Sequence, residues 1–135
     1  MSMFGYKTVL QLGLMNSQNV ELENFSYGFF QSVDDVGKPN GEVYAGSIQI
    51  SFANLPTLEM LEWMMNSRKY KDGNIITYGE DESVLQKLTF TTGACVDMDI
   101  SYSEMGTSYC LTTITVMAKK ITVGETVVEN GWQNV

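Results

Sequence analysis

Two carboxylates, Asp97 and Asp99, are the side chains in this sequence whose type and spacing come nearest to acid–base chemistry. Alternate residues on one strand face lie about 6.6 Å apart, near the separation of the paired carboxylates of inverting glycosidases. Catalysis requires the two groups to occupy unlike environments, whereas neighbours on one wetted strand face share the same environment. We therefore expect a solvated or interface face here, and keep an acid–base enzyme only as an alternative.

The same stretch imitates the opening of a calcium-binding loop, because Asp97, Asp99 and Ser101 alternate along it. Tyr102 stands where that loop requires glycine, and Ser108 stands where it requires glutamate. The chain contains no histidine, which excludes Ser-His-Asp and Cys-His catalysis and imidazole metal ligands. No GxGxxG, P-loop, GxSxG or HExxH motif occurs either. We expect no enzyme activity, no metal and no cofactor.

Acidic residues outnumber basic ones by 16 to 8, so the 135-residue chain carries a net charge of −8. This charge opposes binding to nucleic acid and to anionic membranes. Cys95 and Cys110 are too few for a disulfide scaffold, and we expect both to be reduced residues of the core or of strands. Because residues 1–7 lack a basic segment followed by an apolar one, we expect folding in the cytoplasm without a secretory signal.

Most of the chain alternates apolar and polar residues with a period of two, the pattern of half-buried β-strands. Ile48, Ile50 and Phe52, for example, alternate with small polar residues. The strands expected from this pattern cover residues 8–12, 20–33, 47–52, 75–78, 87–91, 96–102 and 111–121. About seven or eight strands predict a mainly β fold, an antiparallel barrel or sandwich, in a single domain over residues 1–135.

Residues 58–66 break the period of two and predict one short α-helix, with Pro56 and Thr57 suited to its first turn. Its apolar residues are Leu58, Leu61 and Met65 on one face and Met60, Trp63 and Met64 on an adjacent face. This apolar surface is too wide for a helix that water surrounds on most sides. Either the helix plugs the mouth of the barrel or a second chain covers it.

Residues 34–42 are dense in turn formers and too long for a tight two-residue hairpin, so they predict an extended loop between two strands. Two interpretations stay open at this point. The loop is either a solvated connection or a binding element, since longer loops often carry function.

Three groups of residues, in order along nearly the whole chain, carry a resemblance to a known family. The first is Phe25-Ser26-Tyr27, leading through Asp34 or Asp35 and Gly37-Lys38-Pro39 to Gly41, Val43 and Gly46-Ser47-Ile48. The second is Leu61-Glu62-Trp63-Met64, and the third is Leu88-Thr89-Phe90, residues 112–120 and Glu129-Asn130-Gly131-Trp132. With these features the sequence resembles the Hcp tube proteins of the type VI secretion system. It departs from them where Lys38 replaces a common arginine and Ala45 replaces a glycine.

The resemblance implies a barrel-like β domain with one helix that assembles into hexameric rings, which stack into a tube. In that family the tube lies inside a contractile sheath, is capped by a VgrG-like spike protein and carries effector proteins to target cells. It also implies assembly in the cytoplasm of a Gram-negative bacterium and export through the type VI apparatus. The strand pattern also favours assembly into rings, because segments such as residues 112–121 have apolar or threonine side chains on both faces. One small barrel cannot enclose all of these side chains.

The extended segment from Asp34 to Gly46 and part of the helix are the expected contacts between subunits or between stacked rings. The candidate residues are Asp34, Asp35, Gly37, Lys38, Pro39, Gly41, Val43, Gly46, Trp63 and Met64. The alternative function is a monomeric β-barrel that holds a small apolar ligand in its mouth, as the methionine-rich helix suggests.

Overall fold

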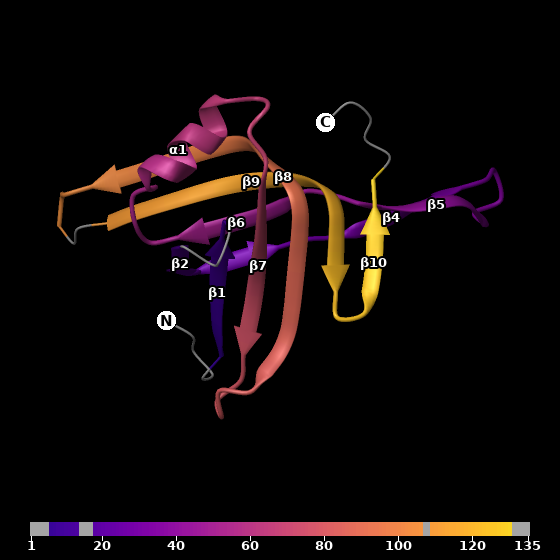
Figure 1. The fold of residues 1–135 in the computed structure, drawn as a ribbon, viewed down its shortest axis with the longest axis horizontal. Helices are drawn as coiled ribbons and strands as arrows, with labels where there is room; N and C mark the ends of the chain where they lie inside the picture. Colours follow the sequence, from indigo (N-terminus) through magenta and orange to yellow (C-terminus); the bar gives the residue numbers. More distant parts are fainter. Residues whose placement is uncertain (1–5, 14–17, 107–108, 131–135) are drawn as a thin grey trace.

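Alternating buried and exposed side chains run along the strands of the computed structural model, which describes residues 6–13, 18–106 and 109–130. Within these residues the chain forms ten strands and one helix (Figure 1). The strands are β1 (Lys7–Leu12), β2 (Gln18–Glu21), β3 (Asn24–Ser26), β4 (Phe29–Val33), β5 (Pro39–Ala45), β6 (Ile48–Phe52), β7 (Lys71–Tyr78), β8 (Val84–Ser103), β9 (Tyr109–Val123) and β10 (Thr126–Glu129). The helix is α1 (Leu58–Met65), so the predicted mainly β fold with one short helix is confirmed.

An antiparallel sheet in the order β2-β1-β7-β8-β9-β6-β3 forms the body of the molecule, and β10 pairs with β9 beside it. The two end strands, β2 and β3, follow one another in the chain. Between them the backbone N–H of Leu22 donates to the carbonyl of Thr8 in β1 (2.9 Å), and that of Glu23 donates to Ser51 in β6 (2.9 Å). One segment therefore joins both ends of the sheet, and the sheet curls into the predicted barrel.

The strands predicted over residues 87–91 and 96–102 are parts of one long, bent strand, β8 (Figure 1), whose pairing is interrupted by register shifts. Two of these shifts lie at β-bulges in the middle of the strand. At the first bulge, Thr92 has a left-handed φ of 54°, and its backbone N–H donates to the carboxylate of Asp72 (2.9 Å). At the second, the register with β9 shifts just after Cys95. Because bulges bend a strand and increase its twist, β8 passes from the barrel wall into a hairpin with β9 that extends beyond it.

The segment predicted as an extended loop, residues 34–42, lies within a two-stranded β-hairpin that projects from the barrel (Figure 1). We call this hairpin, residues 29–45, the arm. Its second strand, β5, already begins at Pro39, so the loop prediction is corrected: only residues 34–38 form the turn. Pro39 and Gly41 suggested a loop, but proline is tolerated at the first position of an edge strand, and Gly41 lies where the register shifts. The strand predicted over residues 20–33 is likewise divided, into β2, β3 and β4.

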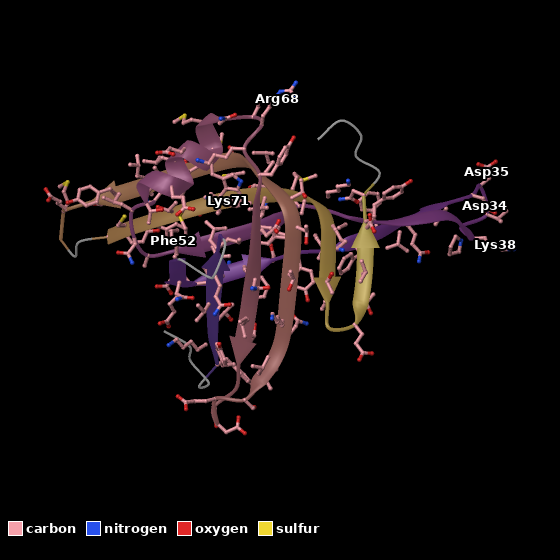
Figure 2. All side chains as sticks on the ribbon, in the orientation of Figure 1. Asp34, Asp35, Lys38, Phe52, Arg68 and Lys71 are labelled. Atoms are coloured by element: carbon pink, nitrogen blue, oxygen red, sulfur yellow. The ribbon has the colours of Figure 1, made fainter. Side chains whose placement is uncertain are left out.

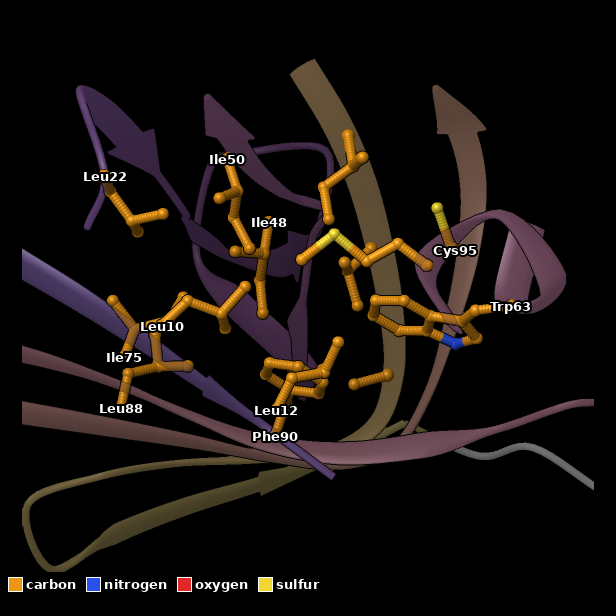
Figure 3. Packing of buried hydrophobic residues seen from close by; sticks show 14 of the residues in the cluster. Leu10, Leu12, Leu22, Ile48, Ile50, Trp63, Ile75, Leu88, Phe90 and Cys95 are labelled. Atoms are coloured by element: carbon orange, nitrogen blue, oxygen red, sulfur yellow. The ribbon is translucent and has the colours of Figure 1, made fainter. Parts of the chain in front are cut away.

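The barrel interior is filled by apolar side chains from its strands and from α1 (Figure 3). The ring of Phe90 lies at one end of this core, over two glycines. A Cβ atom added to Gly73 would lie 2.5 Å from the Phe90 ring, and one added to Gly93 would lie 2.6 Å from it. The Trp63 ring stacks on Phe90, with centroids 6.3 Å apart and planes inclined by 5°. Both glycines are therefore needed to leave room for the aromatic pair.

Replacing Gly93 with alanine is expected to lower the free energy of unfolding by about 1 to 3 kcal/mol, the usual cost of overpacking a core. The new Cβ would also lie 3.0 Å from the carbonyl oxygen of Lys71, so either the Phe90 ring or the backbone must move. Urea unfolding measures the change. Gly28→Ala is the control, because a Cβ there meets no atom within 4 Å. If the two variants are equally stable, Phe90 does not occupy the space above Gly93.

Candidate assembly surfaces

Asp34 builds the turn at the tip of the arm. Its Oδ1 accepts hydrogen bonds from the backbone N–H groups of Val36 (3.0 Å) and Lys38 (2.9 Å). Its carbonyl accepts a third from the N–H of Gly37 (3.0 Å), whose φ of 86° favours glycine. Asp34 and Gly37 therefore shape the turn, whereas the side chains of Asp35 and Lys38 are exposed at the end of the arm (Figure 2).

The arm also carries apolar side chains that the single chain leaves uncovered. The exposed ones are Phe29, Phe30, Val33, Val36 and Val43. The rings of Phe30 and Tyr44 contact one another across the hairpin, with centroids 5.4 Å apart. A two-stranded hairpin has no second layer of its own to bury the rest. Of the predicted contact residues, Pro39, Gly41 and Val43 belong to β5, and Gly46 lies at the base of the arm.

A second uncovered apolar surface lies at the free end of the β8–β9 hairpin. Its exposed side chains are Val96, Ile100, Tyr102, Met105 and Tyr109.

Asp97 and Asp99 are exposed on the other face of β8 from Ile100, where they pair in register with Thr115 and Thr113. The two carboxylates therefore share one wetted face, as predicted. Within the described residues, no group of three or more cysteine, aspartate or glutamate side chains could hold a metal ion.

One face of α1 closes the barrel, and its outer face is uncovered. Thr57 caps the N-terminus of the helix, where its hydroxyl accepts a hydrogen bond from the N–H of Met60 (3.2 Å). Met60 and Trp63 are buried, whereas Leu58 and Met65 are exposed. The helix therefore plugs the barrel with its inner face, and cover of its outer face by a second chain stays a prediction. Among the residues that the structure describes, no helix has the length and apolar content of a membrane span.

Trp63 and Met64 were predicted to contact other subunits, but the structure turns both toward their own barrel. Trp63 is 1% exposed, so its side chain belongs to the core and offers no surface to a neighbour. Met64 is half-buried, with its Sδ 3.8 Å from the Sγ of Cys95 (Figure 3 labels Trp63 and Cys95). An amphipathic pattern cannot separate a face that plugs a barrel from one that meets another chain, because both are apolar.

Both cysteines are free and lie on strands, as predicted. Cys95 is buried on β8, and this burial raises the pKa of its thiol to about 11. The thiol is therefore protonated at neutral pH and is a poor nucleophile. Cys110 is half-buried on β9.

The mouth of the barrel offers little room for the alternative function, the binding of a small apolar ligand. Met60 and Trp63 fill it from α1. A cleft of about 500 Å³ lies beside the first turn of α1, but it opens at the surface. Residues that line this cleft include Val20, Phe52, Leu55, Met60, Tyr102 and Cys110.

Asn130 has a structural role that the sequence did not reveal. Its side chain bonds to Ala45 at the base of the arm and to Ala118 in β9. An asparagine that follows a strand is one signal, since asparagine side chains readily bond to backbone groups. The partner residue, however, lies 85 positions away and cannot be read from spacing. Trp132, quoted from the same C-terminal motif, lies outside the described residues.

The model of one protein family, hemolysin coregulated protein Hcp (TssD), matches residues 4–133 of the chain. The chain belongs to the Hcp family. The match confirms the resemblance seen in the sequence, and with it the prediction that this Hcp chain is a structural tube protein. A comparison with curated proteins found no match.

Solved structures agree with the family match. The structure of Hcp1 from Flavobacterium johnsoniae is similar to this Hcp chain with a TM-score of 0.79 and 26% identity, over 92% of this chain and 99% of that one. Hcp1 from Salmonella typhimurium has a TM-score of 0.67 and 14% identity, over 87% and 84%. A chain of the sheath–tube complex of an extracellular contractile injection system has a TM-score of 0.56 and 16% identity, over 91% and 90%. At these lower identities, the last two share the fold.

Proposed function

We propose that this Hcp chain is the repeating subunit of the inner tube of a type VI secretion system, built from hexameric rings that stack. The observation that carries the proposal is the match of the Hcp family model over residues 4–133. The uncovered apolar side chains of the arm, of the β8–β9 hairpin and of α1 support it. Soluble monomers rarely expose large apolar patches, so several of them favour burial by neighbouring copies.

The shape of the subunit suits a head-to-tail ring. The arm and the free end of the β8–β9 hairpin lie at opposite ends of the longest axis of the molecule (Figure 1). Two different surfaces at opposite ends form a heterologous contact, which closes into a ring when the rotation between neighbours closes. The apolar side chains along the arm would make this contact within the ring, and the exposed tip, with Asp35 and Lys38, would reach the next ring.

The proposed partners of the tube are a contractile sheath around it, a VgrG-like spike at its tip and effector proteins in its lumen. The similarity to a chain of a sheath–tube complex supports the sheath. The net charge of −8 disfavours nucleic acid and anionic membranes as partners. The subunit would act as a single structural domain over residues 1–135, without catalysis, and would be assembled in the cytoplasm and exported through the type VI apparatus.

Sedimentation and negative-stain electron microscopy of the purified chain test the proposal. We expect hexamers of the 15.1 kDa chain at micromolar concentration, seen as rings of uniform diameter. Small-angle scattering gives a further check, because a single chain of this length has a radius of gyration of only about 14 Å. A particle that remains a single chain at every concentration would contradict the proposal.

A further inference from the structure

The arm leaves the barrel at a break in the strand pairing. The β3–β6 pairing ends at Ser26, opposite Gln49, and the β4–β5 pairing begins at Phe29, opposite Ala45. Between them, one backbone hydrogen bond crosses the junction, from the N–H of Gly46 to the carbonyl of Gly28 (2.9 Å). The backbone ladder alone therefore holds the angle between arm and barrel weakly. Tyr27 adds aromatic contacts, with centroids 5.8 Å from Phe25 and 5.9 Å from Phe29.

The side chain of Asn130 supplies further hydrogen bonds between the base of the arm and the barrel. It leaves the end of β10, which stands beside the base of the arm (Figure 1). Its Oδ1 accepts a hydrogen bond from the N–H of Ala45 (3.1 Å), and its Nδ2 donates to the carbonyls of Ala45 (3.3 Å) and Ala118 (2.9 Å). The backbone N–H of Asn130 donates to the carbonyl of Lys119 (2.7 Å), so the residue itself is anchored to β9.

The carboxamide thus pairs with Ala45 as a peptide group of a neighbouring strand would. Ala45 and Ala118 are both buried, at 4% and 0% exposure, so water cannot easily replace these bonds. Only an amide carries both an acceptor and two donors in this arrangement; a carboxylate has no donor for the two carbonyls. The last residue of the arm is therefore tied to the barrel by a chemistry that asparagine provides and aspartate does not.

We propose that Asn130 is a positioning residue, which fixes the angle of the arm and so sets where its tip meets the neighbouring ring. This inference rests on the proposed tube function. The seven residues of β5 span about 20 Å, so a tilt of about 10° at the base would move the tip by roughly 3 to 4 Å. Such a displacement is more than a specific contact tolerates.

Asn130→Asp is the test variant, and Asn24→Asp, at an exposed position on β3, is the control with the same chemical change. Hydrogen exchange of the full chain, followed by mass spectrometry, should reach about tenfold faster rates in peptides of the arm for Asn130→Asp. Peptides of β8 and β9 should keep wild-type rates, which separates a loosened arm from general destabilisation. Electron microscopy should find rings but few stacked tubes. If Asn130→Asp destabilises the whole chain, Asn130→Ser, which removes the carboxamide without adding charge, gives the same comparison.

The possible results distinguish a failure of the role proposed for Asn130 from a failure of the proposed tube function. Wild-type exchange rates in the arm of Asn130→Asp would overturn the tie between Asn130 and the arm. A loosened arm with tubes as abundant as in the wild type would overturn its role in stacking. If the wild-type chain itself forms no rings, the proposed function fails and the stacking role fails with it, while the exchange rates still decide whether Asn130 holds the arm.

Discussion

Replacing Trp63 with alanine is expected to lower the free energy of unfolding by about 3 to 5 kcal/mol, the largest loss foreseen for a single side chain of this protein. The ring is 1% exposed and stacks on Phe90. Its Nε1–H donates to the carbonyl of Gly93 (2.8 Å), which would lose a buried partner. Urea unfolding followed by far-ultraviolet circular dichroism measures the loss, at one fixed chain concentration because assembly itself adds stability.

Two control variants separate the sources of that loss. Trp63→Phe keeps an aromatic ring but removes the N–H donor, and we expect it to cost about 1 to 3 kcal/mol. Leu58→Ala, on the exposed face of the same helix, should stay within about 0.5 kcal/mol of the wild type in the dissociated chain. If Trp63→Ala folded with wild-type stability yet failed to form rings, Trp63 would be a subunit contact, as its sequence pattern first suggested, and its place in the core would be wrong.

Exchanging the two charges at the tip of the arm, in the double variant Asp35→Lys with Lys38→Glu, is expected to abolish stacking of rings into tubes. No hydrogen bond or ion pair joins either side chain to another described residue, so the turn itself should survive. Asp34 is left unchanged because its carboxylate holds the turn. The net charge is also unchanged, so any effect comes from where the charges lie. We expect intact rings and at least tenfold fewer tubes by electron microscopy, on the scale of a charge contact reversed in sign.

The matched control exchanges charges elsewhere, in the variant Lys87→Glu with Glu125→Lys near the β9–β10 turn. These side chains are also exposed, and the net charge is again preserved. Raising the salt concentration to about 1 M, where the Debye length falls to about 3 Å, should reduce the difference between the tip variant and the wild type. Normal tubes from the tip variant would mean that the tip charges do not contribute to stacking.

Local patterns in the sequence predicted much of this fold. The alternation at Ile48, Ile50 and Phe52 placed β6, and these three side chains are buried as expected. Thr57 and the apolar residues after it located α1 to within a residue. The alternation of Asp97 and Asp99 with Met98 also gave their common exposed face. Each of these predictions depends on neighbours two to four positions away, a range over which backbone geometry alone fixes which side chains share a face.

The contacts predicted between subunits stay a prediction, but the structure shows what several of these residues do within the single chain. Asp35 and Lys38 are exposed, as a contact role requires. Asp34 and Gly37 instead shape the turn, and Trp63 lies in the core. A turn former, a core aromatic and a contact residue can be the same amino acid, so type and spacing do not distinguish them.

Only the tertiary structure decided which strands pair with one another and which long-range contacts hold them in place. The strand predicted over residues 20–33 is three strands, β2, β3 and β4, and most of the predicted loop is the turn and second strand of the arm. Residues 18–26 join both ends of the sheet. The tertiary structure also brought Asn130 to Ala45, 85 positions away. The amino-acid sequence by itself determined the strand period, the helix, the charge and the family. The partners of each strand were left to the folded chain, because pairing across long separations depends on which backbone groups meet in space, and no local pattern records that.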